Sequence, residues 1–382
     1  MKYDPIYDQW LDQLLADVAE KIQLTPNAYE RAVDRYNRIA AFLNDALSGL
    51  ADFRPIIYPQ GSFRVGTTIS ACEDNEDYDI DLVLEIAISA GSNPEQVLQL
   101  IGDVMERGKG LLQFSSCRKK KRCVTIEYAD MHLDITPAVL LDGTNPRVIG
   151  IFDRHPDRPD HAVANPEGFA QWFDQRVLPA ELLQKRAMRA HTYPVPDQKP
   201  LEEKPIRLLS IQLLKRFRDL ACDRRSYKRC PSVLLSRLSA EASNGAGLYD
   251  DLRRAAQHLA RTVTLIPPPV SNPRCDEDIL SDRWPEAVSD RDLFAHDLQY
   301  LDDRLSQLSQ QGSQVDKLRI LEELFGERPA RRAFETAAKR LAEKSASGDL
   351  KLGVGRGAMG VAPALAPANA ISVPKHKFYG EH

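Results

Sequence analysis

Apolar residues near the start of the chain recur about every four positions, as they do on one face of a helix. The first series consists of Ile6, Trp10, Leu14, Val18 and Ile22. It predicts a helix over residues 6–23. Thr25 followed by Pro26 is a typical helix start and predicts a second helix that runs to about Leu50. We expect these N-terminal helices, residues 1–50, to span two lobes.

Between residues 54 and 150 the pattern changes to short runs of β-branched and apolar residues, separated by turn residues. Such runs are typical of strands. The expected strands lie at residues 54–60, 78–86, 111–117, 121–129, 131–137 and 148–152. A helix over about residues 95–107, starting near Asn93-Pro94, is expected between them. The mixture predicts a sheet-containing core domain over residues 51–165.

From about residue 166 the pattern is helical almost to the end. The expected helices cover residues 166–178, 204–222, 231–242, 247–264, 289–310, 314–325 and 328–344. They predict a helical C-terminal lobe over residues 166–345. Residues 208–218 predict an amphipathic helix that carries a basic pair. Residues 346–382 are rich in Gly, Ala and Pro and lack helical periodicity, so we expect a mobile tail there. The fold class that follows is α+β, with a mixed-sheet lobe and a helical lobe.

The composition is that of an ordinary globular protein, with 382 residues, 43% of them hydrophobic and 28% charged. No apolar run reaches the roughly 18 residues that a membrane-spanning helix needs, and the N-terminus lacks a signal-peptide pattern. We therefore expect a cytoplasmic protein without membrane contact. The net charge of −4 argues against a general nucleic-acid binder. The six cysteines form no C-x-x-C pair, which gives no support for a zinc site.

A Gly-Ser pair, Gly61-Ser62, follows the first expected strand and is preceded by Gln60. Glycine lets the backbone approach a phosphate closely, and the serine hydroxyl with neighbouring N–H groups supplies hydrogen-bond donors. By itself such a pair is far more often a plain turn. Its interpretation therefore depends on the segments that follow.

An acidic strand supplies that support. Residues two apart in a strand point to the same face, so Asp79 and Asp81 project together. Adjacent carboxylates repel unless a cation lies between them, and hard divalent cations prefer such oxygen ligands. Asp77 has the same parity, but Asp79 and Asp81 lie closer to the apolar run that enters the core. A solvated start of an acidic strand is the alternative interpretation.

A third carboxylate, Asp134, lies in the expected strand at residues 131–137. Three carboxylates from two neighbouring strands can hold two Mg²⁺ ions, which activate an attacking hydroxyl and stabilise a leaving pyrophosphate. His132 shares the face of Asp134. We interpret this histidine as structural, with a contact at the edge of the site as the alternative.

The segments QGSFRVGTTI, YDIDLVLEI and HLDITPAV together resemble the polymerase-β-like nucleotidyltransferase superfamily. Their wording is similar to that of the bacterial CD-NTases, relatives of animal oligoadenylate synthetases and cyclic GMP–AMP synthases that act in CBASS anti-phage signalling. The resemblance implies an active site in the cleft between the lobes. It also implies two Mg²⁺ ions, replaceable by Mn²⁺, on Asp79, Asp81 and Asp134.

The same resemblance implies the reaction and further site residues. ATP, GTP or other nucleoside triphosphates would be joined into a cyclic di- or trinucleotide, a cGAMP-like product foremost, with release of pyrophosphate. Ser62, Lys215 and Ser232 would contact the donor triphosphate, and Gln60 and Gly61 would lie at the nucleotide. Regulatory or conjugating CBASS proteins are expected as partners through the C-terminal tail.

Other interpretations stay open. A linear oligonucleotide synthase or an RNA-modifying transferase would use the same chemistry, and a binding module with an inactive site would use none. Residues 118–122 are five consecutive cations at an expected hairpin turn. We interpret this run as a solvated loop, with a role at the substrate entry or in nucleic-acid binding as the alternatives.

Overall fold

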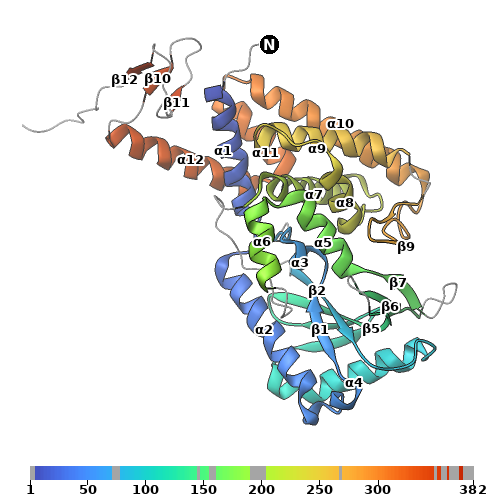
Figure 1. Ribbon diagram of the computed structural model, residues 1–382. Helices are drawn as coiled ribbons and strands as arrows, with labels where there is room; N and C mark the ends of the chain where they lie inside the picture. The colour runs from blue at the N-terminus through green and yellow to red at the C-terminus, as the bar shows by residue number, and fades with distance from the viewer. Residues whose placement is uncertain are drawn as a thin grey trace, which may run out of the picture.

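The structure is a computed structural model. It describes residues 5–70, 78–143, 147–154, 161–189, 204–265 and 269–347, together with three short strands at residues 351–353, 359–360 and 370–372. Two lobes make up the molecule (Figure 1). The lower one in this view holds the large sheet, and the upper one is built of helices. The expected α+β fold with a mixed-sheet lobe and a helical lobe is confirmed.

The large sheet has seven strands among the described residues and mixed topology. Its main path runs β1-β2-β5-β4-β3, and β6 and then β7 continue from β5. The strands are β1 (Ile56–Pro59), β2 (Tyr78–Glu85), β3 (Ser116–Lys119), β4 (Val124–Glu127), β5 (Met131–Asp142), β6 (Val148–Phe152) and β7 (His161–Ala164). β2 and β5 pair in parallel, whereas the other neighbours are antiparallel. The sheet therefore places β2 and β5, the two strands with predicted site residues, side by side at its centre.

Helices α2 (Pro26–Asn44) and α4 (Pro94–Leu112) pack against the sheet through one apolar core. Every second residue of β2, namely Ile80, Leu82 and Leu84, enters this core and is fully buried. Each such leucine contributes on the order of 2 kcal/mol by leaving water. The alternation fixes the register of β2, because a shift by one residue would bury its aspartates.

The helical lobe has its own core, which also takes in the N-terminal helix α1 (Pro5–Lys21). Its other helices are α5 (Pro166–Val177), α6 (Ala180–Arg189), α7 (Ile206–Arg225), α8 (Ser232–Glu241), α9 (Leu248–Val263), α10 (Val288–Gln310), α11 (Gln314–Phe325) and α12 (Glu327–Ser347). A small hairpin of β8 (Ser271–Asn272) and β9 (Cys275–Ile279) completes the lobe. Among the described residues, no helix is long and apolar enough to cross a membrane.

Helix α7 runs through the centre of the helical lobe and contacts α1, α8, α9, α10 and α11. An amphipathic helix was expected, but the structure buries side chains all round it, including charged ones. Buried polar groups need partners. Asp251 of α9 accepts hydrogen bonds from Arg207 at 2.8 Å and from Ser210 at 2.6 Å. Because the helix is enclosed, a polar residue on it can face the sheet lobe in a fixed position.

The end of α4 differs from the expectation. We predicted a strand over residues 111–117, but α4 continues to Leu112 and β3 begins only at Ser116. Gly108 and Leu112 prolong the buried face of the helix. The helix ends at Gln113, which adopts a left-handed conformation with φ of 59°.

The end of α2 also differs, because the helix stops at Asn44 and not near Leu50. The Asp45 carboxylate accepts a hydrogen bond from the Leu47 N–H at 2.8 Å and starts the separate short helix η1 (Ala46–Ser48). A second short helix, η2 (Ala51–Phe53), follows. The pattern of the sequence did not predict α6, β7 or the β8–β9 hairpin. Neither β7 nor β9 alternates between buried and exposed residues, and β8 has only two residues.

The mobile tail expected over residues 346–382 contains secondary structure, and its mobility stays a prediction. α12 extends to Ser347, and three strands after it pair antiparallel in the order β11-β10-β12. These are β10 (Lys351–Gly353), β11 (Met359–Gly360) and β12 (Ala370–Ser372). Strands of two or three residues are held by backbone hydrogen bonds and need no apolar periodicity. The remaining residues after Ser347 lie outside the described part of the chain.

The close packing of α4 on α2 gives a test of the fold. A Cβ added at Gly108 would lie 2.6 Å from Cε1 of Phe42. Gly108→Ala is therefore expected to destabilise the protein by about 1–3 kcal/mol through overpacking. At the exposed Gly110 of the same helix, no described atom lies within 4 Å of such a Cβ. Gly110→Ala should stabilise by about 0.5–1 kcal/mol. Thermal denaturation of both variants measures the two effects, and equal melting temperatures would contradict the described packing.

Candidate active site

Two aspartates project from the same face of β2. Asp79 and Asp81 alternate with Ile80, which is buried on the opposite face. In the parallel pair of β2 and β5, Asp81 lies directly opposite Asp134. The structure thus brings the three predicted carboxylates to one surface of the sheet. Asp77, which has the same parity, lies outside the described residues.

Gly61 joins the Gly-Ser motif to the acidic strand. It opens the short helix α3 (Gly61–Val65) and has a φ of 59°, in the left-handed region. A Cβ at this position would lie 2.7 Å from Oδ2 of Asp81. The N–H of Gln60 also donates to the carbonyl oxygen of Asp81 at 2.9 Å. Only glycine fits both the backbone conformation and the close approach.

The surroundings of the aspartates oppose their ionisation. Burial, followed by the charges of Asp134 and Asp79, raises the pKa of Asp81 to about 7. Partial desolvation in the cleft, followed by the charge of Asp134, also raises the pKa of Asp79. A divalent cation with oxygen ligands removes this repulsion. The chemistry of the donor set fits Mg²⁺, although no three acidic, histidine or cysteine groups of the described residues form a ready-made cage.

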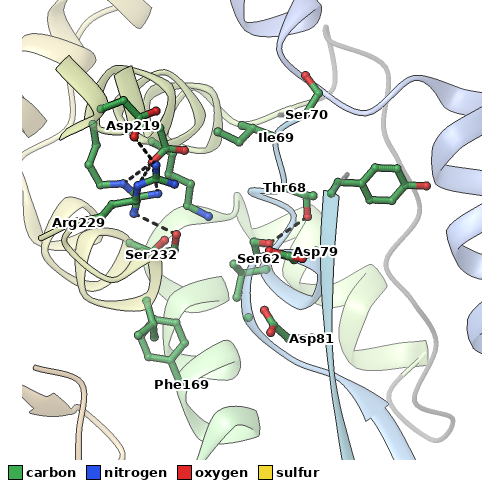
Figure 2. A pocket seen from close by; sticks show the side chains of 18 residues that line it. Ser62, Thr68, Ile69, Ser70, Asp79, Asp81, Phe169, Asp219, Arg229 and Ser232 are labelled. Carbon is green, nitrogen blue, oxygen red and sulfur yellow. Dashed lines mark hydrogen bonds and ion pairs between the residues drawn. The ribbon is translucent and has the colours of Figure 1, made fainter. Parts of the chain in front are cut away.

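A pocket of about 480 Å³ opens beside Asp79 and Asp81 and is lined from both lobes. In Figure 2, Ser62 and the two aspartates lie on the side of the sheet, and Asp219, Arg229 and Ser232 lie on the side of the helical lobe. Lys215 and Arg218 line the pocket too. The sheet lobe contributes the carboxylates of Asp79 and Asp81 to this cavity, and the helical lobe contributes the cations together with Asp219. The size of the cavity suits a small-molecule ligand.

Lys215 of α7 is buried, with 2% of its surface exposed. Its ammonium group donates to the carbonyl oxygen of Thr67 at 3.2 Å and to the Thr67 hydroxyl at 2.7 Å. Burial, followed by the charge of Arg218, lowers the pKa of Lys215 to about 7. An anion in the pocket would favour the charged form of this lysine. The position therefore suits the predicted contact with a phosphate.

The loop that carries Thr67 links the two lobes. Gln212 of α7 donates to the Thr68 carbonyl oxygen at 2.9 Å. The Ser70 N–H donates to the carbonyl oxygen of Ile22, just after α1, at 2.7 Å. Thr68 also donates from its hydroxyl to Ser62 at 3.3 Å. These bonds hold the Gly-Ser motif at a defined distance from α7.

Ser232 starts α8, and its hydroxyl accepts a hydrogen bond from Arg218 at 3.0 Å. Arg218 also pairs with Asp219 at 2.6 Å. Arg229 pairs with Asp219 at 3.5 Å and with Asp223 at 2.9 Å. The sequence reasoning selected Ser232 but missed both arginines. Arg218 could have been found from its position one helical turn after Lys215, whereas Arg229 precedes α8 in a stretch without a periodic pattern.

Two further residues lie at the edge of the site. The Gln60 side chain donates to the Thr136 hydroxyl at 3.4 Å and is not among the residues that line the pocket. His132 Nδ1 lies 3.5 Å from Oδ1 of Asp79. The alternative that His132 contacts the edge of the acidic cluster is therefore the correct one.

The basic run at residues 118–122 does lie at the hairpin between β3 and β4. Several of its members have acidic partners. The pairs are Arg118 with Glu127, Lys119 with Glu95, Lys120 with Asp134, and Arg122 with Asp153. Internal pairing leaves less charge for phosphate backbones, which disfavours the nucleic-acid alternative. The contact of Lys120 with Asp134 connects the run to the site itself.

Comparison with known proteins shows which proteins this chain resembles. Residues 9–176 match the model of the Second Messenger Oligonucleotide or Dinucleotide Synthetase domain. The chain is 29% identical to the cyclic dinucleotide synthase CdnG of Bradyrhizobium diazoefficiens, with 96% of this chain and 94% of that protein covered. It is 25% identical to the c-di-GMP synthase of Roseivirga ehrenbergii, with 97% of both covered.

The fold leads to the same group. The solved structure of the Bradyrhizobium diazoefficiens CD-NTase CdnG in complex with GTP matches with a TM-score of 0.70 and 28% identity, covering 86% of this chain and 99% of that one. The domain match, the full-length relatives and the shared fold agree with the motifs on α3, β2 and β5. These findings indicate a nucleotidyltransferase that is similar over nearly its whole length to cyclic dinucleotide synthases of the CD-NTase group.

Proposed function

We propose that this protein is a Mg²⁺-dependent cyclic dinucleotide synthase that uses GTP. The observation that carries the proposal is one cavity lined by Asp79 and Asp81 from the sheet lobe and by Lys215, Arg218 and Ser232 from the helical lobe. A nucleoside triphosphate has a reacting phosphorus at one end of its phosphate chain and a negatively charged terminus at the other. The aspartates suit metal ions at the reacting phosphorus, and the groups of the helical lobe suit the terminus.

In the proposed complex the donor triphosphate lies between the lobes. The Ser62 hydroxyl would donate to it from the sheet lobe, and Lys215 would bind it from α7 as an ammonium ion. Arg218 already directs the Ser232 hydroxyl by a hydrogen bond, so the two would act together on the terminal phosphate. Charge-assisted hydrogen bonds of this kind are the strongest that a phosphate forms with a protein.

Asp79, Asp81 and Asp134 would be the ligands of two Mg²⁺ ions, with Mn²⁺ as a substitute. When bound, such ions lower the pKa of the attacking ribose hydroxyl and offset the charge of the leaving pyrophosphate. Asp134 would serve the acceptor side, because it does not line the donor pocket. Attack on the α-phosphorus gives a linear dinucleotide, and a second transfer by the same residues closes the ring.

The choice of GTP rests on the relatives. One is named as a c-di-GMP synthase, and another is solved in complex with GTP. A product with two guanines is therefore our first candidate. The cGAMP-like product expected from the sequence remains the second. We also propose that the product acts in CBASS anti-phage signalling and that the C-terminal tail is the point of contact for regulatory or conjugating proteins.

The activity can be tested with the purified full-length chain. Incubation with labelled GTP, alone or with ATP, and Mg²⁺ or Mn²⁺ should give a product that resists phosphatase and is identified by mass spectrometry. Asp79→Ala combined with Asp81→Ala should reduce the rate by at least about 10³-fold, because both metal ligands on β2 are lost. A phosphatase-sensitive product would support a linear synthase in place of a cyclase. Absence of any nucleotide consumption across metals and pH would overturn the proposal.

Lys215→Met separates binding from folding. The substitution keeps the length of the side chain but removes its charge, so GTP affinity should fall about 10- to 100-fold, as for a lost hydrogen bond to a charged group. The melting temperature should change little, because removal of a buried charge is offset by the loss of two hydrogen bonds to the buried Thr67. Direct GTP binding by calorimetry and thermal denaturation report the two effects. Unchanged GTP affinity would show that Lys215 has no phosphate contact.

Asp81→Asn tests the charge of the acidic cluster. The pKa of Asp81 lies above the usual 3.8, at about 7, so ionised Asp81 destabilises the metal-free fold. This cost begins near pH 4, where the unfolded chain loses its proton, and reaches full size above pH 7. The difference between these two pKa values corresponds to at most about 4 kcal/mol in the free energy of unfolding. The variant should therefore melt at a higher temperature than the parent protein, by more at pH 8 than at pH 5.

Added Mn²⁺ gives the control for that experiment. It should stabilise the parent protein at pH 8 more than at pH 5 and should stabilise the Asn variant little, because the amide is a poor substitute for the carboxylate. Equal gains from Asp81→Asn at both pH values would contradict the raised pKa.

A further inference from the structure

Lys120 lies on the acidic cluster from outside the donor pocket. It belongs to the turn between β3 and β4, where its N–H donates to the Cys123 carbonyl oxygen at 2.8 Å. Its ammonium nitrogen lies 3.2 Å from Oδ1 and 3.1 Å from Oδ2 of Asp134. The lysine therefore spans both oxygens of this carboxylate.

A second contact limits how Asp134 can accept another ligand. The Thr125 hydroxyl, from the neighbouring position on β4, donates to Oδ1 of the same carboxylate. A divalent cation needs direct access to a carboxylate oxygen. With Thr125 on one oxygen and the ammonium group across both, a cation that binds Asp134 has to displace Lys120.

The pair is close in space but only partly shielded from water. Half of the Lys120 side chain is exposed to water, whereas 17% of Asp134 is. An exposed ammonium group on a long side chain can move away at small cost, because exposed ion pairs contribute about 0–1 kcal/mol.

The other cations of residues 118–122 do not share this position. Their described ion pairs are with acidic residues outside the cluster of Asp79, Asp81 and Asp134. Lys121, next in the chain, is exposed. Lys120 thus differs from the other cations of this run in its position beside Asp134 and not in its charge. Lys121 therefore offers a matched control.

We propose that Lys120 is a built-in counter-ion of Asp134, which holds this carboxylate in place before the metal binds and competes with the acceptor-side metal ion for it. The inference rests on the proposed role of the three aspartates as metal ligands. Lys120 acts through Asp134, so it is a positioning residue and not a catalytic one. Because the metal ion has to displace Lys120, a higher metal concentration is needed to occupy the acceptor-side metal position.

The test measures Mn²⁺ binding to the full-length protein without nucleotide, from the loss of the electron paramagnetic resonance signal of free Mn²⁺. Lys120→Met should bind Mn²⁺ more tightly than the parent protein, by about fivefold, the equivalent of an exposed ion pair of about 1 kcal/mol. Lys121→Met removes the same net charge away from Asp134 and should change the affinity by less than about twofold. Lys120→Arg keeps the charge and should bind like the parent protein or more weakly.

A second background makes the test specific. In Asp134→Asn, the substitution Lys120→Met should no longer change Mn²⁺ affinity, because the residue through which it acts is absent. Equal effects of Lys120→Met and Lys121→Met, or weaker binding in Lys120→Met, would overturn the inference while leaving the two-metal proposal intact. A parent protein whose Mn²⁺ binding is unchanged by Asp79→Ala and Asp81→Ala would overturn that proposal first.

Discussion

The crowding of three carboxylates on two neighbouring strands is the constraint on which the rest of this structure depends. The parallel register that sets Asp81 opposite Asp134 forces like charges together, and the fold answers this in several ways. Gly61 leaves room for the Asp81 carboxylate, burial and repulsion raise the pKa of Asp81, and Lys120 neutralises Asp134 from the opposite side. In the proposed two-metal site, bound cations would offset this repulsion, so an arrangement that costs stability in the free protein would serve function.

The same logic explains why the helical lobe buries charged residues at its centre. A surface lysine would reach the pocket in many conformations, whereas Lys215 on the enclosed helix α7 is held by two oxygens of Thr67. Gln212 and the Ser70 N–H hold the same loop on α7 and next to α1. The loop from residue 66 to 70 thus connects the Gly-Ser motif to α7. Its bonds fix the distance across the cavity before any ligand enters.

Much of the site could be predicted from local patterns, because the two-residue repeat of a strand is local. Strand parity selected Asp79 and Asp81, and alternation around residue 134 selected Asp134. The register between β2 and β5, by contrast, pairs residues fifty-three positions apart in sequence, such as Asp81 with Asp134, and no local pattern sets it. The contact of Lys120 with Asp134 depends on the turn between β3 and β4 and on the pairing of β4 with β5, so a local pattern did not predict it either. Arg218 and Arg229 were missed for the same reason, since their role follows from a cavity between lobes. In the fold, α7 was expected to be amphipathic, but its polar side is buried as well. The sequence does not show the partners, such as Asp251, that make this burial possible.

Asp81 has a pKa raised to about 7 and Lys215 has a pKa lowered to about 7, and both residues line the same cavity. The charge of each group acts on the pKa of the other, but burial outweighs this attraction in both. In the proposed complex, a cation at the carboxylates and a triphosphate at the lysine would supply further counter-charges and would favour ionised Asp81 and protonated Lys215. The proposed ligands would therefore change the protonation of two groups that the free protein already holds in place, Asp81 beside Gly61 and Lys215 on Thr67.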